Sequence, residues 1–173
     1  MTTEYLLNRE LGHVLAALTP TNQLVMRTCL HTGLRLSDVL ALKTEQLGNR
    51  FWITEGKTGK RRMVGLTNEL IDAIKRQNSG SFWAFPHRTR PNTHRTRQSV
   101  WRDVKRAQKA FRLPQNIGPH SARKVYAVEL MAKYGDIERV RRVLNHRYQS
   151  TTALYAMADK LLEGKMVQKR RGK

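Results

Sequence analysis

Five short segments of the sequence carry side chains that can bind a phosphate group or move a proton. They are Thr32–Leu42, Gly56–Lys60, His120–Arg123, Leu144–His146 and Tyr155. Arginine keeps its charge and binds two phosphate oxygens with its planar fork. Lysine and histidine transfer protons, and tyrosine can attack phosphorus where cations offset its pKa of about 10. These residue types fit cleavage of a phosphodiester bond, because cations must hold the charge that develops on the phosphate oxygens.

The charge balance points to the same kind of substrate. The 173 residues include 33 Lys and Arg but 13 Asp and Glu, which gives a formal net charge of +20. This excess argues against an ordinary neutral metabolic enzyme and favours a polyanionic partner, for which we take double-stranded DNA. The acids are few and scattered, which argues against a two-metal carboxylate site. We also expect no cofactor.

Three clusters of cations are the predicted contacts for DNA phosphates. One lies at 57–62, one at 86–113, where the single acid is Asp103, and one in the tail 164–173, which has no acid. A solvated or disordered tail is the alternative for the third cluster. From the first two clusters we predict the following DNA-binding residues: Lys60, Arg61, Arg88, Arg90, Arg95, Arg97, Arg102, Lys105 and Arg106.

The elements that must position these residues are mainly helices. Apolar residues at helical spacing, with capping residues before them, predict helices over 8–18, 20–31, 37–42, 67–74, 97–110, 120–134, 136–144 and 151–157. The predicted caps include Ser37, Thr67 and Asp136, and Gly33 is expected to break the helix that precedes it. Aromatic and β-branched residues predict a hairpin of strands 50–54 and 62–66, with Lys57 near its tip, and a third short strand over 81–85. The predicted fold is therefore α+β and mainly α, with a small antiparallel three-stranded sheet.

In their order and spacing, the five segments resemble the catalytic domain of the tyrosine recombinase (phage integrase) family. The resemblance spans about residues 19–159, and the nine-residue step from His146 to Tyr155 is its most specific part. It implies a catalytic domain over 1–163, a basic C-terminal tail over 164–173 and no N-terminal core-binding domain. It also implies a cytoplasmic protein of bacterial or phage origin, and no apolar run approaches the ~20 residues that cross a bilayer.

The resemblance also implies a role for each matched residue. Arg35 and Arg123 would clamp the scissile phosphate, and Asp38, one helical turn from Arg35, would support that arginine. Lys57 on the hairpin would protonate the leaving 5′ oxygen, and His120 would assist proton transfer at the nucleophile. His146 would bind a phosphate oxygen, and Tyr155 would form a 3′-phosphotyrosyl link.

The expected function is site-specific recombination or integration of DNA, without metal or ATP because the covalent link retains the energy of the broken bond. Four protomers would act on two duplexes, and a free protomer can be a monomer. Lys60 is an alternative to Lys57 as the acid, and Asn145 stands where the family usually has glycine. Two other functions stay open: a non-catalytic basic DNA-binding protein of the same fold, and nicking and resealing of the type IB topoisomerase kind.

Overall fold

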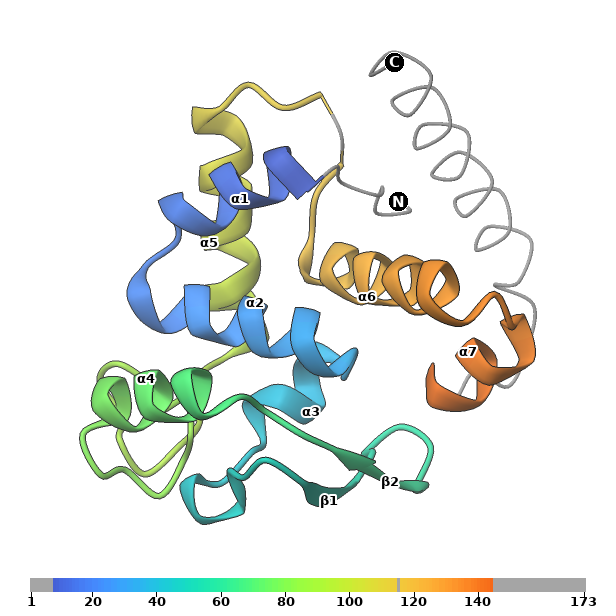
Figure 1. Ribbon diagram of the computed structural model, residues 1–173. Coiled ribbons are helices and arrows are strands. Elements are labelled where there is room, and N and C mark those ends of the chain that lie inside the picture. The colour runs from blue at the N-terminus through green and yellow to red at the C-terminus, as the bar shows by residue number, and fades with distance from the viewer. Residues whose placement is uncertain (1–7, 115, 145–173) are drawn as a thin grey trace.

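The computed structural model describes residues 8–114 and 116–144, in which a group of helices carries one β-hairpin at its edge (Figure 1). The helices are α1 (Asn8–Ala17), α2 (Pro20–Thr32), α3 (Leu36–Leu40), α4 (Asn68–Asn78), α5 (Arg97–Ala110), α6 (Pro119–Tyr134) and α7 (Ile137–Leu144). The strands are β1 (Phe51–Thr54) and β2 (Arg61–Val64), preceded by the 3₁₀ helix η1 (Thr44–Gln46). All the predicted helices are confirmed except the one over 151–157, which lies outside the described residues.

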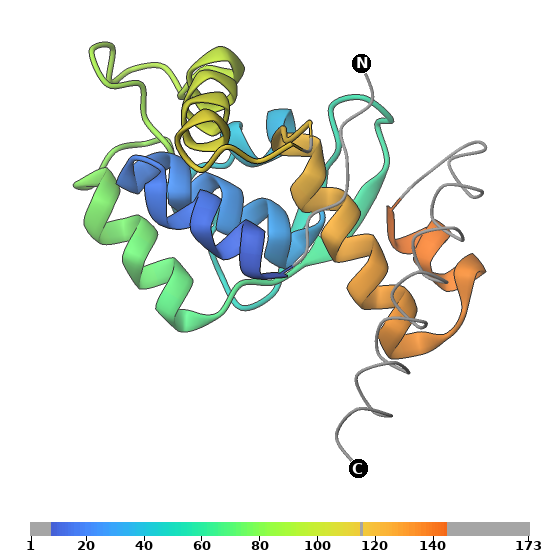
Figure 2. The same cartoon turned by 90° about the horizontal axis from the view of Figure 1, so that it is seen from above.

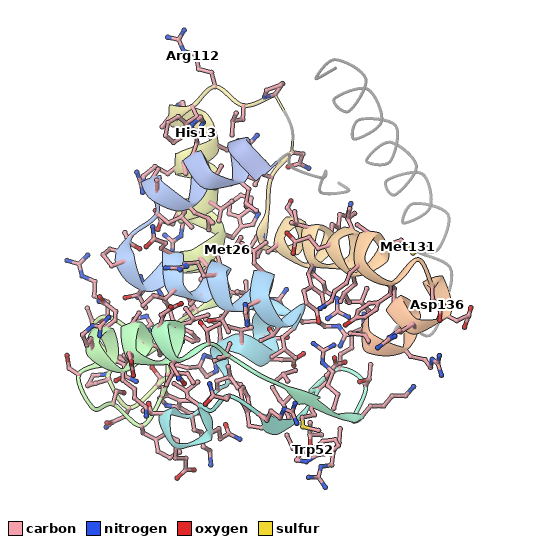
Figure 3. All side chains as sticks on the ribbon, in the orientation of Figure 1. His13, Met26, Trp52, Arg112, Met131 and Asp136 are labelled. Carbon is pink, nitrogen blue, oxygen red and sulfur yellow. The ribbon has the colours of Figure 1, made fainter. Side chains whose placement is uncertain are left out.

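Helix α2 is the centre of the fold because it buries residues on several sides. It packs against α1, α3, α4, α5 and α6, and the view from above in Figure 2 shows these helices around it. Met26 lies near its middle and is fully buried, surrounded by other side chains (Figure 3). The helix begins at Pro20, whose fixed φ suits the first helical position. None of the helices in the described part of the chain is long and apolar enough to cross a membrane.

Asp103, the single acid of the basic stretch 86–113, fixes α5 to the start of α2. Its Oδ2 accepts hydrogen bonds from the backbone N–H of Thr19 (2.9 Å), the Thr19 hydroxyl (2.8 Å) and the Asn22 amide (2.7 Å). Burial alone would raise the pKa of Asp103, but these bonds and one from Arg106 hold it below its usual range. The carboxylate therefore stabilises this corner at neutral pH, and the stabilisation is lost as the pH falls through the lowered pKa.

Helix α2 ends at Thr32, and Gly33 follows it as the C-cap, where the sequence predicts the break. Gly33 has a φ of 61°, in the left-handed region that favours glycine, and its N–H donates to the Cys29 carbonyl at 2.8 Å. A Cβ at this position would lie 2.1 Å from the ring of Tyr126 on α6. Glycine therefore lets α6 pack directly on the turn that leads into Arg35.

The hairpin of β1 and β2 is confirmed, and Thr54 pairs with Arg61 at the end next to the loop. The loop between them closes on Glu55, whose N–H donates to the Lys60 carbonyl (3.0 Å) and whose carbonyl accepts from Gly59 (2.8 Å). Gly59 has a φ of 66°, which is the conformation that a glycine tolerates in such loops. The loop is thus a defined turn that presents Lys57.

The third strand predicted over 81–85 is not found among the described residues, where the sheet has two strands. The segment instead makes an isolated antiparallel bridge between Trp83 and Lys43. A longer ladder cannot form because the chain coils into η1 directly after Lys43. The sheet that carries the site is therefore the hairpin alone.

Helix α7 packs on α6 through a small apolar cluster of its own, which includes Val140, Leu144 and Ala127. Asp136 caps the helix as predicted, since its Oδ1 accepts from the backbone N–H of Arg139 at 3.1 Å. The described part of the helix runs to Leu144, two residues before the predicted His146.

Candidate active site

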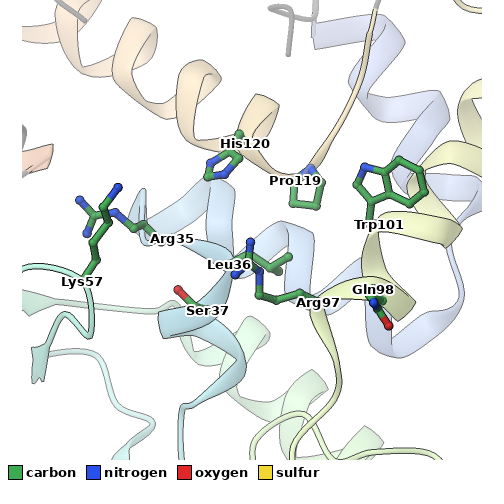
Figure 4. Close-up of a pocket in the computed structure, with 9 residues that line it drawn as sticks. All are labelled: Arg35, Leu36, Ser37, Lys57, Arg97, Gln98, Trp101, Pro119 and His120. Carbon is green, nitrogen blue, oxygen red and sulfur yellow. The ribbon is translucent and has the colours of Figure 1, made fainter. Parts of the chain in front are cut away.

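An open pocket of about 830 Å³ lies between α3, the hairpin loop, α5 and the start of α6. Figure 4 shows Arg35 and Lys57 together on one side of it, His120 near its middle, and Trp101 on the opposite side. The lining residues are Arg35, Leu36, Ser37, Lys57, Arg97, Gln98, Trp101, Pro119 and His120. Three residues predicted to act on the phosphate therefore meet in one pocket, although they come from three separate elements.

Arg35 reaches the pocket from the position before α3. Its backbone is extended (φ −70°, ψ 149°), and α3 begins at Leu36, so the prediction that Ser37 caps this helix is wrong. Its guanidinium Nη1 lies 2.5 Å from Oε2 of Glu55 and 3.9 Å from Oδ2 of Asp38. The side chain is 16% exposed, which leaves part of the guanidinium open to the pocket.

Asp38 ties α3 to the hairpin as well as facing Arg35. Its Oδ1 accepts a hydrogen bond of 3.0 Å from the N–H of Gly56, next to Lys57. The carboxylate is 5% exposed. Asp38 is predicted to support Arg35, but its contact with that arginine (3.9 Å) is longer than its hydrogen bond to the loop that carries Lys57 (3.0 Å).

Glu55 is not among the predicted site residues, yet it is the acid nearest to Arg35 in the part of the chain that the structure describes. Its side chain is fully buried and also accepts from the Thr58 hydroxyl at 3.1 Å. Burial alone would raise the pKa of Glu55, but the bond and charge of Arg35 and the charge of Arg62 hold it below its usual range. The signal that could have found it is strand alternation, because Phe51 and Ile53 face inward and Glu55 continues that series.

Arg123 lies behind the pocket, 7% exposed on the first half of α6. Its Nη1 donates to the Gly33 carbonyl at 2.7 Å, and its Nη2 donates to the carbonyl of Leu144. Burial, together with the charge of nearby Arg35, lowers the pKa of Arg123 to about 10, so it is still charged at neutral pH. Arg123 therefore connects the turn before Arg35 with the end of α7.

His120 stands in the first turn of α6, directly after Pro119. Partial burial against the pocket wall, and then the charges of Arg123 and Arg97, lower the pKa of His120 below its usual range. The imidazole is therefore neutral near pH 7, which is the form that can accept a proton.

We expect His120 to titrate below the usual histidine pKa of about 6.5 in the DNA-free protein. Replacing Arg97 by glutamine should raise its pKa, because one repelling charge is lost. Because the folded state favours the neutral imidazole, this group should cost stability increasingly as the pH falls below about 6.5. Imidazole proton NMR against pH measures the titration, with the signal assigned by its loss in His120→Gln. A His120 pKa that is unchanged or lower in Arg97→Gln would contradict this account.

Three of the nine predicted DNA-binding side chains make polar contacts within the protein. Arg95 donates to the Asn22 side chain, and Arg106 pairs with Asp103 at 2.7 Å. Lys105 donates to Gln108 and Asn116. The remaining six are exposed and can face DNA: Lys60, Arg61, Arg88, Arg90, Arg97 and Arg102.

The remaining predicted site residues, His146 and Tyr155, lie outside the described residues, as does Asn145. Of the two candidate acids, Lys57 lines the pocket whereas Lys60 is not among its described lining residues. Within 8–114 and 116–144, no three His, Cys, Asp or Glu residues are grouped so that they could hold a metal ion.

Comparison with known sequences places these features in one family. The profile of the phage integrase family matches residues 4–161. The tyrosine recombinase XerD of Rhizobium meliloti (strain 1021) is 33% identical over 134 residues, which is 72% of this chain and 43% of that protein. The integrase of Escherichia phage P2 is 30% identical over 155 residues, 89% of this chain and 43% of that protein. The chain therefore spans less than half the length of these relatives.

Solved structures share the fold. The catalytic core of lambda integrase superposes with a TM-score of 0.70 at 20% identity, covering 86% of this chain and 95% of that one. The XerH site-specific recombinase bound to a palindromic difH substrate in a post-cleavage complex gives 0.71 at 23% identity, covering 96% and 53%. The mainly helical arrangement with a small antiparallel sheet is thus that of integrase catalytic cores. With the profile match over nearly its whole length, the chain belongs to the phage integrase family.

Proposed function

We propose that this chain is the catalytic part of a site-specific recombinase that cleaves and rejoins DNA through a 3′-phosphotyrosyl link to Tyr155. The pocket that gathers Arg35, Lys57 and His120 is the observation that carries the proposal. It offers a guanidinium for a non-bridging oxygen, an ammonium that can give up a proton and a neutral imidazole that can take one. The names of the relatives, integrase and tyrosine recombinase, support the same activity.

In the proposed cleavage step, the Tyr155 oxygen attacks phosphorus while His120 assists removal of the tyrosine proton. Arg35 and Arg123 hold the non-bridging oxygens, and His146 donates a hydrogen bond to one of them. Lys57 gives a proton to the departing 5′ oxygen. Rejoining is the reverse, because a free 5′ hydroxyl attacks the phosphotyrosine and releases Tyr155. The phosphodiester energy is retained in the covalent link, so the proposed cycle consumes no ATP and assigns no step to a metal.

Double-stranded DNA is the proposed partner. The six exposed cations named above supply sequence-independent attraction to phosphates, which weakens with salt. Exchange between two duplexes requires four cleaved strands, so we propose four protomers on DNA. XerH and lambda integrase were both solved on DNA substrates, which supports the choice of partner.

The proposal is tested by trapping the covalent intermediate. A nicked duplex, chosen from a random library by binding to this protein, loses its short 5′-hydroxyl product after cleavage and cannot be resealed. We expect a protein–DNA band on a denaturing gel in EDTA, with the nucleotide located on Tyr155 by mass spectrometry. A bound duplex that is never cleaved would favour the non-catalytic DNA-binding protein. Relaxation of plasmid without exchange would favour the topoisomerase-like activity.

Lys57, rather than Lys60, should be the acid that protonates the leaving 5′ oxygen. Replacing Lys57 by alanine should slow cleavage about 100-fold on ordinary DNA, the usual effect of losing a general acid. A 5′-bridging sulfur should restore the rate, because a thiol with a pKa near 8.5 leaves without a proton. Lys60→Ala is the matched control, expected to stay within a few-fold of the parent. A sulfur-rescued loss in Lys60→Ala instead would assign the acid to Lys60.

A further inference from the structure

We infer that Glu55 is a positioning residue for the proposed cleavage, and that its buried carboxylate sets the orientation in which Arg35 meets the scissile phosphate. The inference rests on the proposed function, since it concerns the same phosphate site. Among the described residues, Glu55 is the acid closest to Arg35, with 2.5 Å between Oε2 and Nη1, against 3.9 Å for Asp38. The guanidinium is therefore held mainly from the hairpin and not from its own helix.

The carboxylate is itself held by a rigid turn. The Glu55 N–H donates to the Lys60 carbonyl, and its own carbonyl accepts from Thr58 (3.3 Å) and Gly59 (2.8 Å). The Thr58 hydroxyl shares Oε2 with Arg35. The backbone of Glu55 is fixed by three hydrogen bonds in one turn and its side chain is fully buried, so the carboxylate has little freedom to move and can hold the arginine in one orientation.

The charges around Glu55 also fit a phosphodiester. Three arginines, Arg35, Arg62 and Arg123, act on one another electrostatically here, and two buried carboxylates, Glu55 and Asp38, offset them. Three arginines against two carboxylates leave this group of five side chains with one net positive charge, which favours binding of an anion such as a phosphodiester. Without Glu55 the group would carry two unbalanced positive charges at low solvent exposure, where unpaired charges are costly. Arg35, at the pocket edge, is the arginine free to turn away toward solvent.

A purely structural role would link Glu55 chiefly to Arg62, and the geometry argues against that. The Arg62 Nε lies 3.5 Å from Oε1, a full ångström farther than Arg35 from Oε2. Arg62 also has other acceptors, because its guanidinium donates to the carbonyls of Thr32 (2.5 Å) and Val143. The close contact of the carboxylate is therefore with the arginine that lines the pocket.

Two substitutions at Glu55 separate orientation from charge. Glu55→Asp keeps the charge but withdraws the carboxylate by one methylene, and Glu55→Gln keeps the length but removes the charge. We expect single-turnover cleavage of the nicked duplex to fall about tenfold in Glu55→Asp and about 100-fold in Glu55→Gln, with DNA affinity within about threefold of the parent. Glu45→Gln is the control, because Glu45 is 72% exposed and outside the pocket.

The 5′-bridging sulfur duplex identifies the group through which Glu55 acts. The sulfur should restore Lys57→Ala but leave the Glu55 variants slow, because their defect lies at the non-bridging oxygens. Parent-like cleavage in both Glu55 variants would overturn the inference. So would full rescue by sulfur, since Glu55 would then act through Lys57. Thermal unfolding checks each variant, and if Glu55→Gln does not fold, the charge-preserving Glu55→Asp decides.

A second readout does not depend on catalysis. Phenylglyoxal modifies accessible guanidinium groups, and mass spectrometry can follow Arg35 in the DNA-free protein. We expect Arg35 to react faster in Glu55→Asp than in the parent, and as slowly in Glu45→Gln as in the parent. Unchanged reactivity in Glu55→Asp would overturn the inference. Absence of any covalent complex with the parent protein would instead refute the proposed function, so the two failures are distinguishable.

Discussion

Replacing Arg123 by lysine is expected to lower the rate of DNA cleavage by about 10³-fold, although the charge is retained. An arginine that clamps a transferring phosphoryl group offers two parallel N–H donors, which an ammonium cannot reproduce. The effect should appear in the rate of covalent-complex formation more than in DNA affinity, because the clamp matters most as charge develops on phosphorus.

The same change should also loosen the protein around the site. The Arg123 guanidinium joins the carbonyls of Gly33 and Leu144, which lie 111 residues apart in the sequence, and one ammonium cannot span both. Each charged hydrogen bond contributes about 1.5–3 kcal/mol, so we expect the free energy of unfolding to fall by about 3 kcal/mol. The end of α7, which leads toward His146, would lose one of its ties to the turn before Arg35.

Single-turnover cleavage of the nicked duplex and denaturant unfolding measure the two effects of Arg123→Lys. Arg142→Lys on α7 is the matched control, since Arg142 is exposed and its hydrogen bond within the described residues is a weak one of 3.4 Å to the Glu138 carbonyl. If Arg123→Lys cleaves within threefold of the parent, Arg123 does not clamp the phosphate. If the free energy of unfolding of Arg123→Lys is also unchanged, the two hydrogen bonds from Arg123 to backbone carbonyls do not contribute to stability.

The sequence was most informative where local rules decide the structure. Gly33 caps the end of α2 in a left-handed conformation, and the Thr67 side chain caps α4 by accepting from the N–H of Leu70 at 3.4 Å. Both outcomes depend on residues within one helical turn, which is why pattern and spacing predict them. That Arg35, Lys57 and His120 lie together could be predicted only from the family resemblance, because neither periodicity nor capping relates elements so far apart in the sequence.

Charged side chains were harder to assign because their partners are remote in the sequence. Glu55 binds Arg35 across 20 residues, and Asp103 binds Thr19 across 84 residues. A count of cations cannot tell which ones are used inside the protein, so Arg95 was predicted to face DNA although its guanidinium binds Asn22. The prediction of a third strand was wrong for a similar reason. Its pairing with the segment at Lys43 would have required the chain after Lys43 to stay extended.

Gly33→Ala should be the most destabilising small substitution at the turn that leads into the site. The left-handed φ of 61° costs an alanine about 1–2 kcal/mol, and the contact of its Cβ at 2.1 Å with the Tyr126 ring adds about 1–3 kcal/mol of overpacking. We expect a total loss of about 3 kcal/mol in the free energy of unfolding, measured by urea titration. Cleavage should slow as well, because the Gly33 carbonyl that holds Arg123 must shift.

Gly135→Ala provides the matched control at the end of α6. Gly135 has nearly the same φ (62°) and the same capping hydrogen bond to the fourth residue before it, but a Cβ there meets no described residue within 4 Å. It should therefore lose only the conformational cost of about 1–2 kcal/mol, and the difference between the two variants measures the clash with Tyr126. In the Tyr126→Ala background the clash is absent, so Gly33→Ala should then cost no more than Gly135→Ala. Equal losses in the free energy of unfolding for Gly33→Ala and Gly135→Ala in the parent background would mean that the Tyr126 ring moves aside without strain. In that case the close packing of α6 on this turn does not hold Arg35 and Arg123 in place.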